Sequence, residues 1–249
     1  MTDYHNISIQ WNGAEFQWTN IATVFNLAHS TNIYIQDLII DREDDLPFTA
    51  WEVVANTTTY VDILVDANHP VKASPTVEIF AEWDSFNNRP ANGGYWHTQR
   101  DTDNSCSVLN STTIRCTKQS DFAMDVWDDI VVIFQKYVYN TISWYGASDI
   151  TIKNVDIYAA AWMWVYVRKW KNITLDTVNI IPRPNSWRWF SVNADATHFN
   201  TMRWNVNILN SEFSNMWDDG VNIHALYHEV VEVVDENTLG LVDASQGTM

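Results

Sequence analysis

Short runs of alternating apolar and polar residues recur along the chain, and each opens on Asn or Asp. They are NISI at 6–9, NIYI at 32–35, DITI at 149–152, NITL at 172–175 and NVNI at 205–208. Such alternation is typical of a half-buried β-strand. The interval from the first run to the second is close to the interval from the third to the fourth. The pattern predicts repeated short strands and no sustained helix.

A period of this kind indicates a solenoid, in which each coil buries its apolar side against the coils above and below it. The interval lengthens between the fourth run and the fifth, where the segment PRPNSWRW intervenes. We therefore expect an all-β fold, most simply a right-handed parallel β-helix. Asn residues at recurrent corners are expected to stack as ladders.

The coil period is interrupted between about residues 51 and 140, where strand-like runs such as YVDILV and DIVVIF are joined by polar turns. We expect residues 1–50 to form the first coils and 51–140 an inserted β-barrel-like domain. Residues 141–249 are expected to continue the β-helix and to carry the site. One irregular coil with long loops is the alternative.

Charge and aromatic content narrow the class of partner. The chain has 14 Lys and Arg against 31 Asp and Glu, a net charge of −17. This charge disfavours nucleic acid, anionic membranes and acidic substrates such as polyuronates. Fourteen Trp residues suit the flat faces of sugar rings. We expect a carbohydrate partner, no nucleic-acid or membrane partner, and leave a homo-oligomer open.

The sequence has no obvious targeting segment. The opening MTDYHNISIQWNG lacks a basic region followed by an apolar run, and no apolar stretch is long enough to span a membrane. Cys106 and Cys116 could form a disulfide or remain two thiols, and the sequence cannot choose. We expect an extracellular or periplasmic protein whose export signal lies outside this sequence.

Three aspartates are related by the coil period. Asp218 and Asp219 are adjacent in NMWDDGVNIH, and Asp195 precedes Asp218 by 23 residues and Asp219 by 24, which is one coil, since 23 residues also separate the runs starting at 149 and 172. Residues one coil apart lie roughly 4.8 Å from each other across a parallel pair. The three carboxylates should therefore cluster, and such a cluster shares protons, binds a cation or acts on a substrate. A solvated turn is the plain alternative, because Trp-Asp-Asp also occurs at 127–129.

These residues carry a family resemblance. SVNADATHF, followed one coil later by MWDDGVNIH, resembles the Asp and Asp-Asp pairing of β-helical glycoside hydrolases. The phrases IIDREDDLPFTAWEVV and VNIIPRPNSWRWFSVNADATHF narrow it to glycoside hydrolase family 110, the exo-acting α-1,3-galactosidases. The resemblance is strongest over 149–224. It implies a parallel β-helix with an inserted β-domain, hydrolysis with inversion, and catalytic roles for Asp195, Asp218 and Asp219.

The residue types fit that chemistry. Inverting hydrolysis uses one protonated carboxyl and one ionised carboxylate separated by about 6.5–9.5 Å. We expect Asp195 and one member of the Asp218–Asp219 pair to work across such a gap, while the other tunes its neighbours or holds a hydroxyl. Which acts as acid stays open. No cofactor and no metal is expected.

Other residues near the acids are candidates for sugar binding. His198 and His224 could hydrogen-bond hydroxyls, Arg183 and Arg188 could contact hydroxyls or steady a carboxylate, and Trp217 could form a stacking wall. Each has a plain alternative, namely a structural histidine, a surface ion pair or a packed indole.

Rival functions remain at this point. Asn193-Ala-Asp195 also matches a polygalacturonase-like hydrolase, although the acidic chain disfavours a polyuronate substrate. A Ca²⁺-dependent β-helix lyase is a further option, since clustered acids bind hard cations. A non-catalytic β-helix, carbohydrate-binding or structural, is the alternative from a different class.

Overall fold

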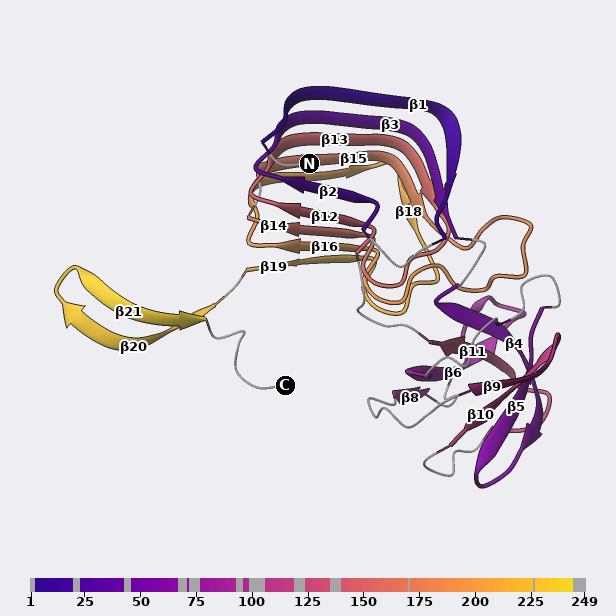
Figure 1. Cartoon of the computed structure of the whole chain (residues 1–249). Helices are drawn as coiled ribbons and strands as arrows, with labels where there is room; N and C mark the ends of the chain where they lie inside the picture. Colours follow the sequence, from indigo (N-terminus) through magenta and orange to yellow (C-terminus); the bar gives the residue numbers. More distant parts are fainter. Residues whose placement is uncertain are drawn as a thin grey trace.

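The computed structural model describes residues 3–19, 23–42, 46–66, 71, 77–92, 96–98, 106–118, 124–134, 140–169, 171–225 and 227–243. In these ranges the chain forms β-strands and no α-helix (Figure 1). The all-β expectation is confirmed. No helix with the length and apolar character needed to cross a membrane is found in the described ranges.

Two parallel sheets form the part of the molecule named here the coil stack (Figure 1). The first sheet has the order β1 (His5–Gln17), β3 (Thr31–Asp41), β13 (Ser148–Ile157), β15 (Lys171–Ile180) and β17 (Arg203–Leu209), with the short β18 (Glu212–Phe213) also paired to β15. The second has the order β2 (Phe25–Ala28), β12 (Ile142–Tyr145), β14 (Val165–Arg168), β16 (Thr197–Asn200) and β19 (Val221–His224). Strands of the two sheets alternate along the chain, so successive coils stack, consistent with the expected parallel β-helix.

The alternating runs of the sequence lie in register in the first sheet. Ile7 pairs with Ile33, Ile33 with Ile150, Ile150 with Ile173, and Ile173 with Val206. The three central isoleucines are at most 2% exposed, because alternate side chains of a strand point to opposite faces. The predicted stacking of these runs is confirmed, and such columns build the core of the coil stack.

Asn and Asp residues occupy the corners at which each coil turns into the first sheet. Asn6, Asn32, Asp149 and Asn172 have φ between 49° and 58°, in the left-handed region that Asn and Asp tolerate better than most residues. Asn32 Nδ2 donates to Asn6 Oδ1 at 2.7 Å, and Asn172 Nδ2 donates to Asp149 Oδ1 at 2.8 Å. The expected corner ladders are present.

Between β3 and β12 the chain forms a unit of antiparallel strands, named here the insert. Its order is β7 (Arg89–Pro90), β6 (Ile79–Asp84), β11 (Asp129–Ile133), β4 (Phe48–Asn56), β5 (Tyr60–Leu64), β10 (Thr113–Thr117) and β9 (Cys106–Asn110), with β8 (Trp96–Thr98) also on β6. The insert has a hydrophobic core of its own. In the described residues β7 and β9 do not pair, so closure into a barrel stays a prediction. Residues 135–139, beside the expected boundary at 140, lie outside the described ranges.

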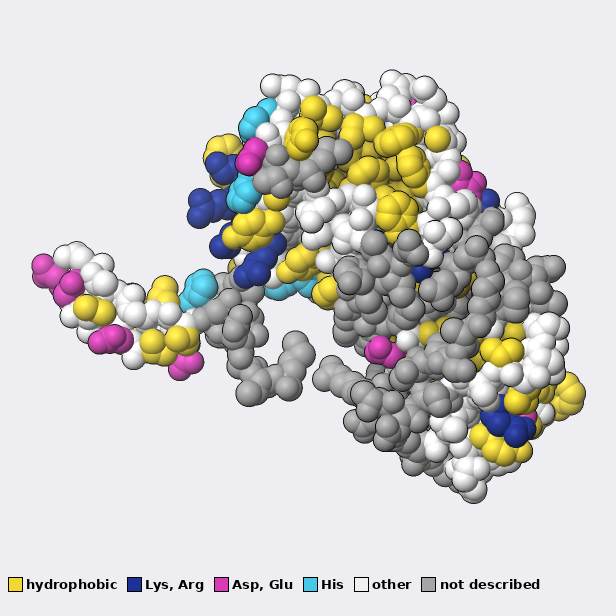
Figure 2. Space-filling view, viewed as in Figure 1, with side chains coloured by type: hydrophobic (Ala, Val, Ile, Leu, Met, Phe, Trp, Pro, Cys, Tyr) yellow, Lys and Arg dark blue, Asp and Glu magenta, His cyan; other side chains and the backbone are white. Residues whose placement is uncertain are grey.

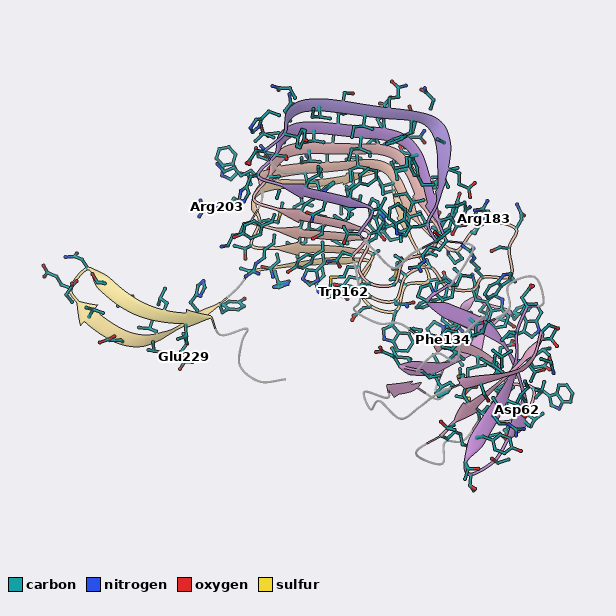
Figure 3. The ribbon with its side chains drawn as sticks, viewed as in Figure 1. Asp62, Phe134, Trp162, Arg183, Arg203 and Glu229 are labelled. Carbon is teal, nitrogen blue, oxygen red and sulfur yellow. A yellow bond between two sulfur atoms is a disulfide. The ribbon has the colours of Figure 1, made fainter. Side chains whose placement is uncertain are left out.

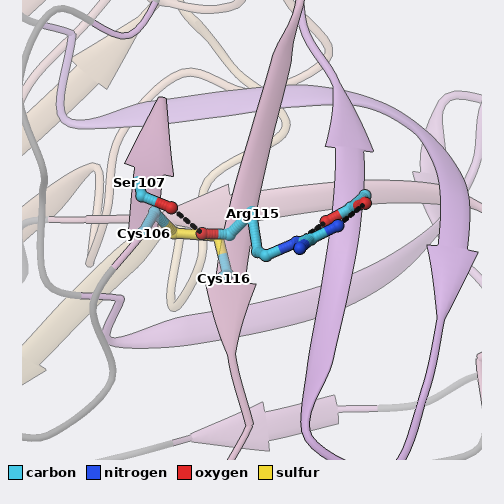
Figure 4. The surroundings of a disulfide bond; sticks show 5 residues. Cys106, Ser107, Arg115 and Cys116 are labelled. Carbon is cyan, nitrogen blue, oxygen red and sulfur yellow. Dashed lines mark hydrogen bonds and ion pairs between the residues drawn. A yellow bond between two sulfur atoms is a disulfide. The ribbon is translucent and has the colours of Figure 1, made fainter. Parts of the chain in front are cut away.

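A disulfide links β9, at one edge of the insert, to the neighbouring strand β10. Cys106 and Cys116 are register partners on β9 and β10 and form this bond (Figure 4). Beside it, Arg115 donates two hydrogen bonds of 2.7 Å to the carboxylate of Asp62 on β5. The structure therefore decides between the two states that the sequence left open for these cysteines.

Aromatic residues pack the insert against the coil stack. Phe48 and Trp83 of the insert make edge contacts with Phe190, with 5.5 and 6.1 Å between ring centroids. Asn193 Nδ2 donates to the carbonyl of Pro47 at 3.3 Å. The insert is thus anchored close to Asp195, beside the candidate site.

The last described strands project from the coil stack as an antiparallel hairpin (Figure 1). They are β20 (His228–Asp235) and β21 (Thr238–Asp243), and they pair with each other. Apolar side chains such as Val233, which is 70% exposed, lie beside acidic ones on its surface (Figure 2). Among the described residues the stacked coils therefore end with β19.

Candidate functional site

Three turns stack at the edge where β14, β16 and β19 begin. Ala160 in the first turn bridges to Val192 in the second. The amide of Trp217 in the third turn donates to Val192 O at 3.0 Å, and the amide of Ala196 donates to Asp219 O at 2.8 Å. These bonds continue the parallel pairing of the strands, so residues one coil apart remain adjacent within the turns.

Asp195, Asp218 and Asp219 lie together on the second and third turns. One oxygen from each carboxylate lies within 4.8 Å of the others. Asp195 is only 3% exposed, whereas Asp218 and Asp219 are exposed. The amide of Asp219 donates to Asp195 Oδ1 at 3.3 Å. The cluster expected from the coil period is present, with one buried carboxylate beside two exposed ones.

Carboxylates this close repel one another when all are ionised, and a shared proton or a hard cation such as Ca²⁺ relieves the repulsion. One oxygen of each carboxylate lies within 4.8 Å of the others, which is closer than the separation of about 6.5–9.5 Å between the carboxyl groups of inverting glycosidases. The limit applies to one oxygen atom of each group and does not give the separation of the carboxyl groups themselves.

Two histidines extend the cluster over the outer face of the second sheet. His198 Nδ1 lies 2.6 Å from Asp195 Oδ2, and His198 Nε2 lies 2.8 Å from His224 Nε2. A carboxylate without a proton only accepts hydrogen bonds, so His198 donates from Nδ1 whenever Asp195 is the unprotonated member of the cluster. Of the two Nε2 atoms, one donates and the other accepts. His198 therefore connects the buried carboxylate to the exposed imidazole of His224.

Trp217, directly before the acid pair, packs toward the insert. Its ring lies 6.3 Å from that of Phe190, and it joins the aromatic cluster between the insert and the coil stack. The indole is half-buried. It anchors the turn that carries Asp218 and Asp219.

Arg183 and Arg188 both bind Asp41, at the end of β3 (Arg183 is labelled in Figure 3). The side chains of Asp41 and Arg188 are 0% and 1% exposed, and that of Arg183 is 30% exposed. Arg183 also binds Glu15 at 2.6 Å. The hydrogen bond from Arg183 lowers the pKa of Glu15, and both carboxylates raise the pKa of Arg183. The carboxylate that these arginines steady is Asp41.

Sequence reasoning missed two aromatic residues beside the cluster. Tyr166 on β14 pairs in register with His198, and their ring centroids lie 5.4 Å apart. The indole of Trp162 lies almost parallel to the Tyr166 ring, with 6.4 Å between centroids and 16° between planes. The available signal was the coil register, which places Tyr166 one coil before His198.

Known proteins resemble the chain along nearly all of its length. α-1,3-Galactosidase A of Shewanella woodyi is 23% identical over 255 residues, which cover 96% of this chain and 42% of that protein. α-1,3-Galactosidase B of Phocaeicola vulgatus is 25% identical and that of Bacteroides fragilis is 24% identical, with the same shares covered. The chain is a relative of these galactosidases. It spans 42% of the length of these curated relatives, and no family model matches it.

Proposed function

We propose that this chain carries the reaction centre of a glycosidase that removes terminal α-galactosides. The observation that carries the proposal is the cluster of Asp195, Asp218 and Asp219 on adjoining turns, in a chain related over 96% of its length to proteins named α-1,3-galactosidase. Glycoside hydrolysis needs one carboxyl group to give a proton and another to activate water or attack the sugar. The cluster supplies both from neighbouring coils.

In the proposed reaction, water attacks the anomeric carbon while the bond to the leaving oxygen breaks. One carboxylic acid protonates the leaving oxygen, and one carboxylate takes the proton from water. Asp195 and one of Asp218 and Asp219 carry these roles, and the third acid binds a sugar hydroxyl. The bond from His198 to Asp195 supports this assignment, because positioned groups contribute more to catalysis than mobile ones.

We propose inversion, as the family resemblance implies, although one oxygen of each carboxylate lies within 4.8 Å of the others, which leaves less room for water than a separation of about 6.5–9.5 Å. Inversion therefore requires the exposed Asp218 or Asp219 side chain to turn away from Asp195 as sugar and water enter. Proton NMR of the first product distinguishes inversion from retention. An α-galactoside releases β-galactose on inversion and α-galactose on retention.

The other residues expected to bind sugar differ in how well their positions suit that role. His224 is exposed beside the cluster and Trp217 borders it, so both are proposed to contact sugar at the rim. The bonds of Arg183 and Arg188 to Asp41 favour a supporting role for these two residues. A direct sugar contact by either arginine stays a prediction.

We also propose the wider organisation expected from the sequence, a right-handed parallel β-helix within 1–50 and 141–249 with 51–140 inserted as a β-barrel-like domain. In the described residues β4 of the insert already begins at Phe48, and the β20–β21 hairpin stands outside the coils. The parallel register of the coils and the antiparallel pairing of the insert support it. The Cys106–Cys116 disulfide supports an extracellular or periplasmic location, since disulfides persist in oxidising compartments. The net charge of −17 supports a neutral glycan as partner.

A cation-dependent lyase or a non-catalytic binding protein is the second candidate. The same three carboxylates favour it, because oxygen ligands within 4.8 Å of one another suit a hard cation. A polygalacturonase-like site is less well supported, since Asn193 of the Asn-x-Asp sequence is buried and donates to Pro47 of the insert.

Asp→Asn substitution at 195, 218 or 219 tests the proposal, because it keeps the size of the side chain and removes the titrating group. Loss of a general acid or base should lower turnover of a terminal α-galactoside by about 10²–10⁴-fold. The matched control is Asp128→Asn in the other Trp-Asp-Asp sequence, where Asp128 Oδ2 accepts a 2.6 Å bond from the Asp125 amide. Its turnover should equal that of the parent.

The outcomes separate the candidates. Near-parental turnover in both Asp195→Asn and Asp218→Asn would show that the cluster is not the catalytic machinery. Loss of parental activity on chelation would favour the cation-dependent candidate. Faster release of sugar from polygalacturonate than from a neutral α-galactoside would reverse the choice of substrate.

A further inference from the structure

Two aromatic side chains lie one coil before the acids, Tyr166 on β14 of the second sheet and Trp162 in the turn that precedes β14. Val165 and Val167 are fully buried, so the alternation of β14 places Tyr166 on the opposite, outward face, where it is half-buried. Trp164 is fully buried in the core, whereas Trp162 is half-buried. Trp162 lies at the edge of the coil stack where β14 begins (Figure 3).

The two rings form a stacked pair. Their planes differ by 16° and their centroids are 6.4 Å apart, so they make one aromatic patch, contributed by the turn before β14 and by β14 itself. The patch adjoins the reaction centre through a single residue, because the Tyr166 ring lies 5.4 Å from that of His198 and His198 bonds Asp195 at 2.6 Å. Adjacent parallel strands are separated by about 4.8 Å, so the patch begins about one strand spacing from β16.

Flat aromatic surfaces with an apolar body and a polar tip suit ligands that present both C–H faces and hydroxyls. A pyranose ring has this chemistry, and the net charge of −17 favours a neutral ring over an acidic one. We propose that Trp162 and Tyr166 bind the neutral sugar on the leaving-group side of the scissile bond. This inference rests on the proposed glycosidase function and assigns the residues that select its leaving group.

The test compares two substrates that share the terminal sugar and differ in the leaving group. For an α-1,3-linked digalactoside, Trp162→Ala should raise KM by about 3- to 10-fold, the order expected for one aromatic contact. For α-galactosyl fluoride, which has no ring in its leaving group, kcat/KM should stay within about 2-fold of the parent, since the lost contact was worth little there. Tyr166→Ala should behave as Trp162→Ala does, and Tyr166→Phe, which keeps the ring, should behave as the parent does.

Trp204→Ala is the matched control, because Trp204 lies on β17 of the other sheet and is 75% exposed. It should change neither substrate's kinetics. An equal fall in kcat/KM for both substrates, or an unchanged KM for the digalactoside, would overturn the inference. If Trp162→Ala fails to fold by circular dichroism, Trp162→Phe should show a smaller rise in KM for the digalactoside alone.

Failure of the proposed function has a separate signature. If the parent hydrolyses neither substrate, that function is wrong, and digalactoside binding measured by calorimetry then tests the aromatic surface by itself. Weaker binding by Trp162→Ala than by the parent and Trp204→Ala would support the surface as a sugar site. Equal binding by all three proteins, or no binding by the parent, would overturn it.

Discussion

Removal of the Arg188 guanidinium should destabilise the coil stack strongly. The side chains of Asp41 and Arg188 are 0% and 1% exposed, so Arg188→Met leaves a buried carboxylate without its most buried partner. Breaking a buried ion pair from one side costs about 3–5 kcal/mol. Arg183 and the Arg42 amide, 2.7 Å from Asp41 Oδ1, still hold the carboxylate. We therefore expect the free energy of unfolding to fall by about 3 kcal/mol, near the lower end of this range.

Urea denaturation followed by tryptophan fluorescence and circular dichroism measures this loss. With a denaturant slope of about 2–3 kcal/mol/M, the midpoint should fall by about 1–1.5 M. The control is Lys153→Met, because Lys153 pairs with Asp176 at 3.1 Å with side chains 49% and 20% exposed. An exposed pair of this kind contributes about 0–1 kcal/mol. A loss below about 1 kcal/mol for Arg188→Met would refute the reasoning from burial.

A double variant separates support of the fold from contact with substrate. Asp41→Asn combined with Arg188→Met removes both buried charges, and replacement of a buried pair by neutral groups is often without net cost. Most of the stability should therefore return. If Arg188 acts only through Asp41, turnover in the proposed galactosidase reaction returns with the stability. If Arg188 contacts the sugar, stability returns and turnover does not.

Three further predictions address other parts of the molecule. Replacing Cys106 and Cys116 by Ser opens a loop with a sequence separation of 10 and should lower the free energy of unfolding by about 2–3 kcal/mol; an unchanged urea midpoint would contradict it. Because the hydrogen bond from Arg183 lowers the pKa of folded Glu15, the stability from this pair is present above the ordinary glutamate pKa and is lost as pH falls through the folded value. Glu15→Gln should lack this acid-dependent loss in pH-stability profiles, and identical profiles would count against it. Thr177 has φ 57°, which is costly for a β-branched residue, so Thr177→Asn should raise the free energy of unfolding by about 0.5–1 kcal/mol in thermal denaturation; a lower Tm would contradict this.

The sequence by itself was sufficient to predict the coil stack and the clustering of the three aspartates. Alternation is a local property, and its recurrence predicts which residues share a column, so Ile150 and Ile173 are register partners as expected. The same period predicts that Asp195 and Asp219, one coil apart, meet, and the amide of Asp219 does bond to Asp195. The repeat makes this prediction possible because each coil pairs in register with its neighbour, so residues one period apart lie next to each other.

Contacts between residues that are not one coil apart could be found only in the tertiary structure. Arg188 binds Asp41, far earlier in the chain, and the insert that intervenes has its own antiparallel pairing and removes any periodic signal between the two. The disulfide and the bond from His198 to Asp195 depend on side-chain directions that residue type alone leaves open. The parallel Trp162 and Tyr166 rings likewise depend on which face of β14 looks outward, and burial of that strand against its neighbours determines the face.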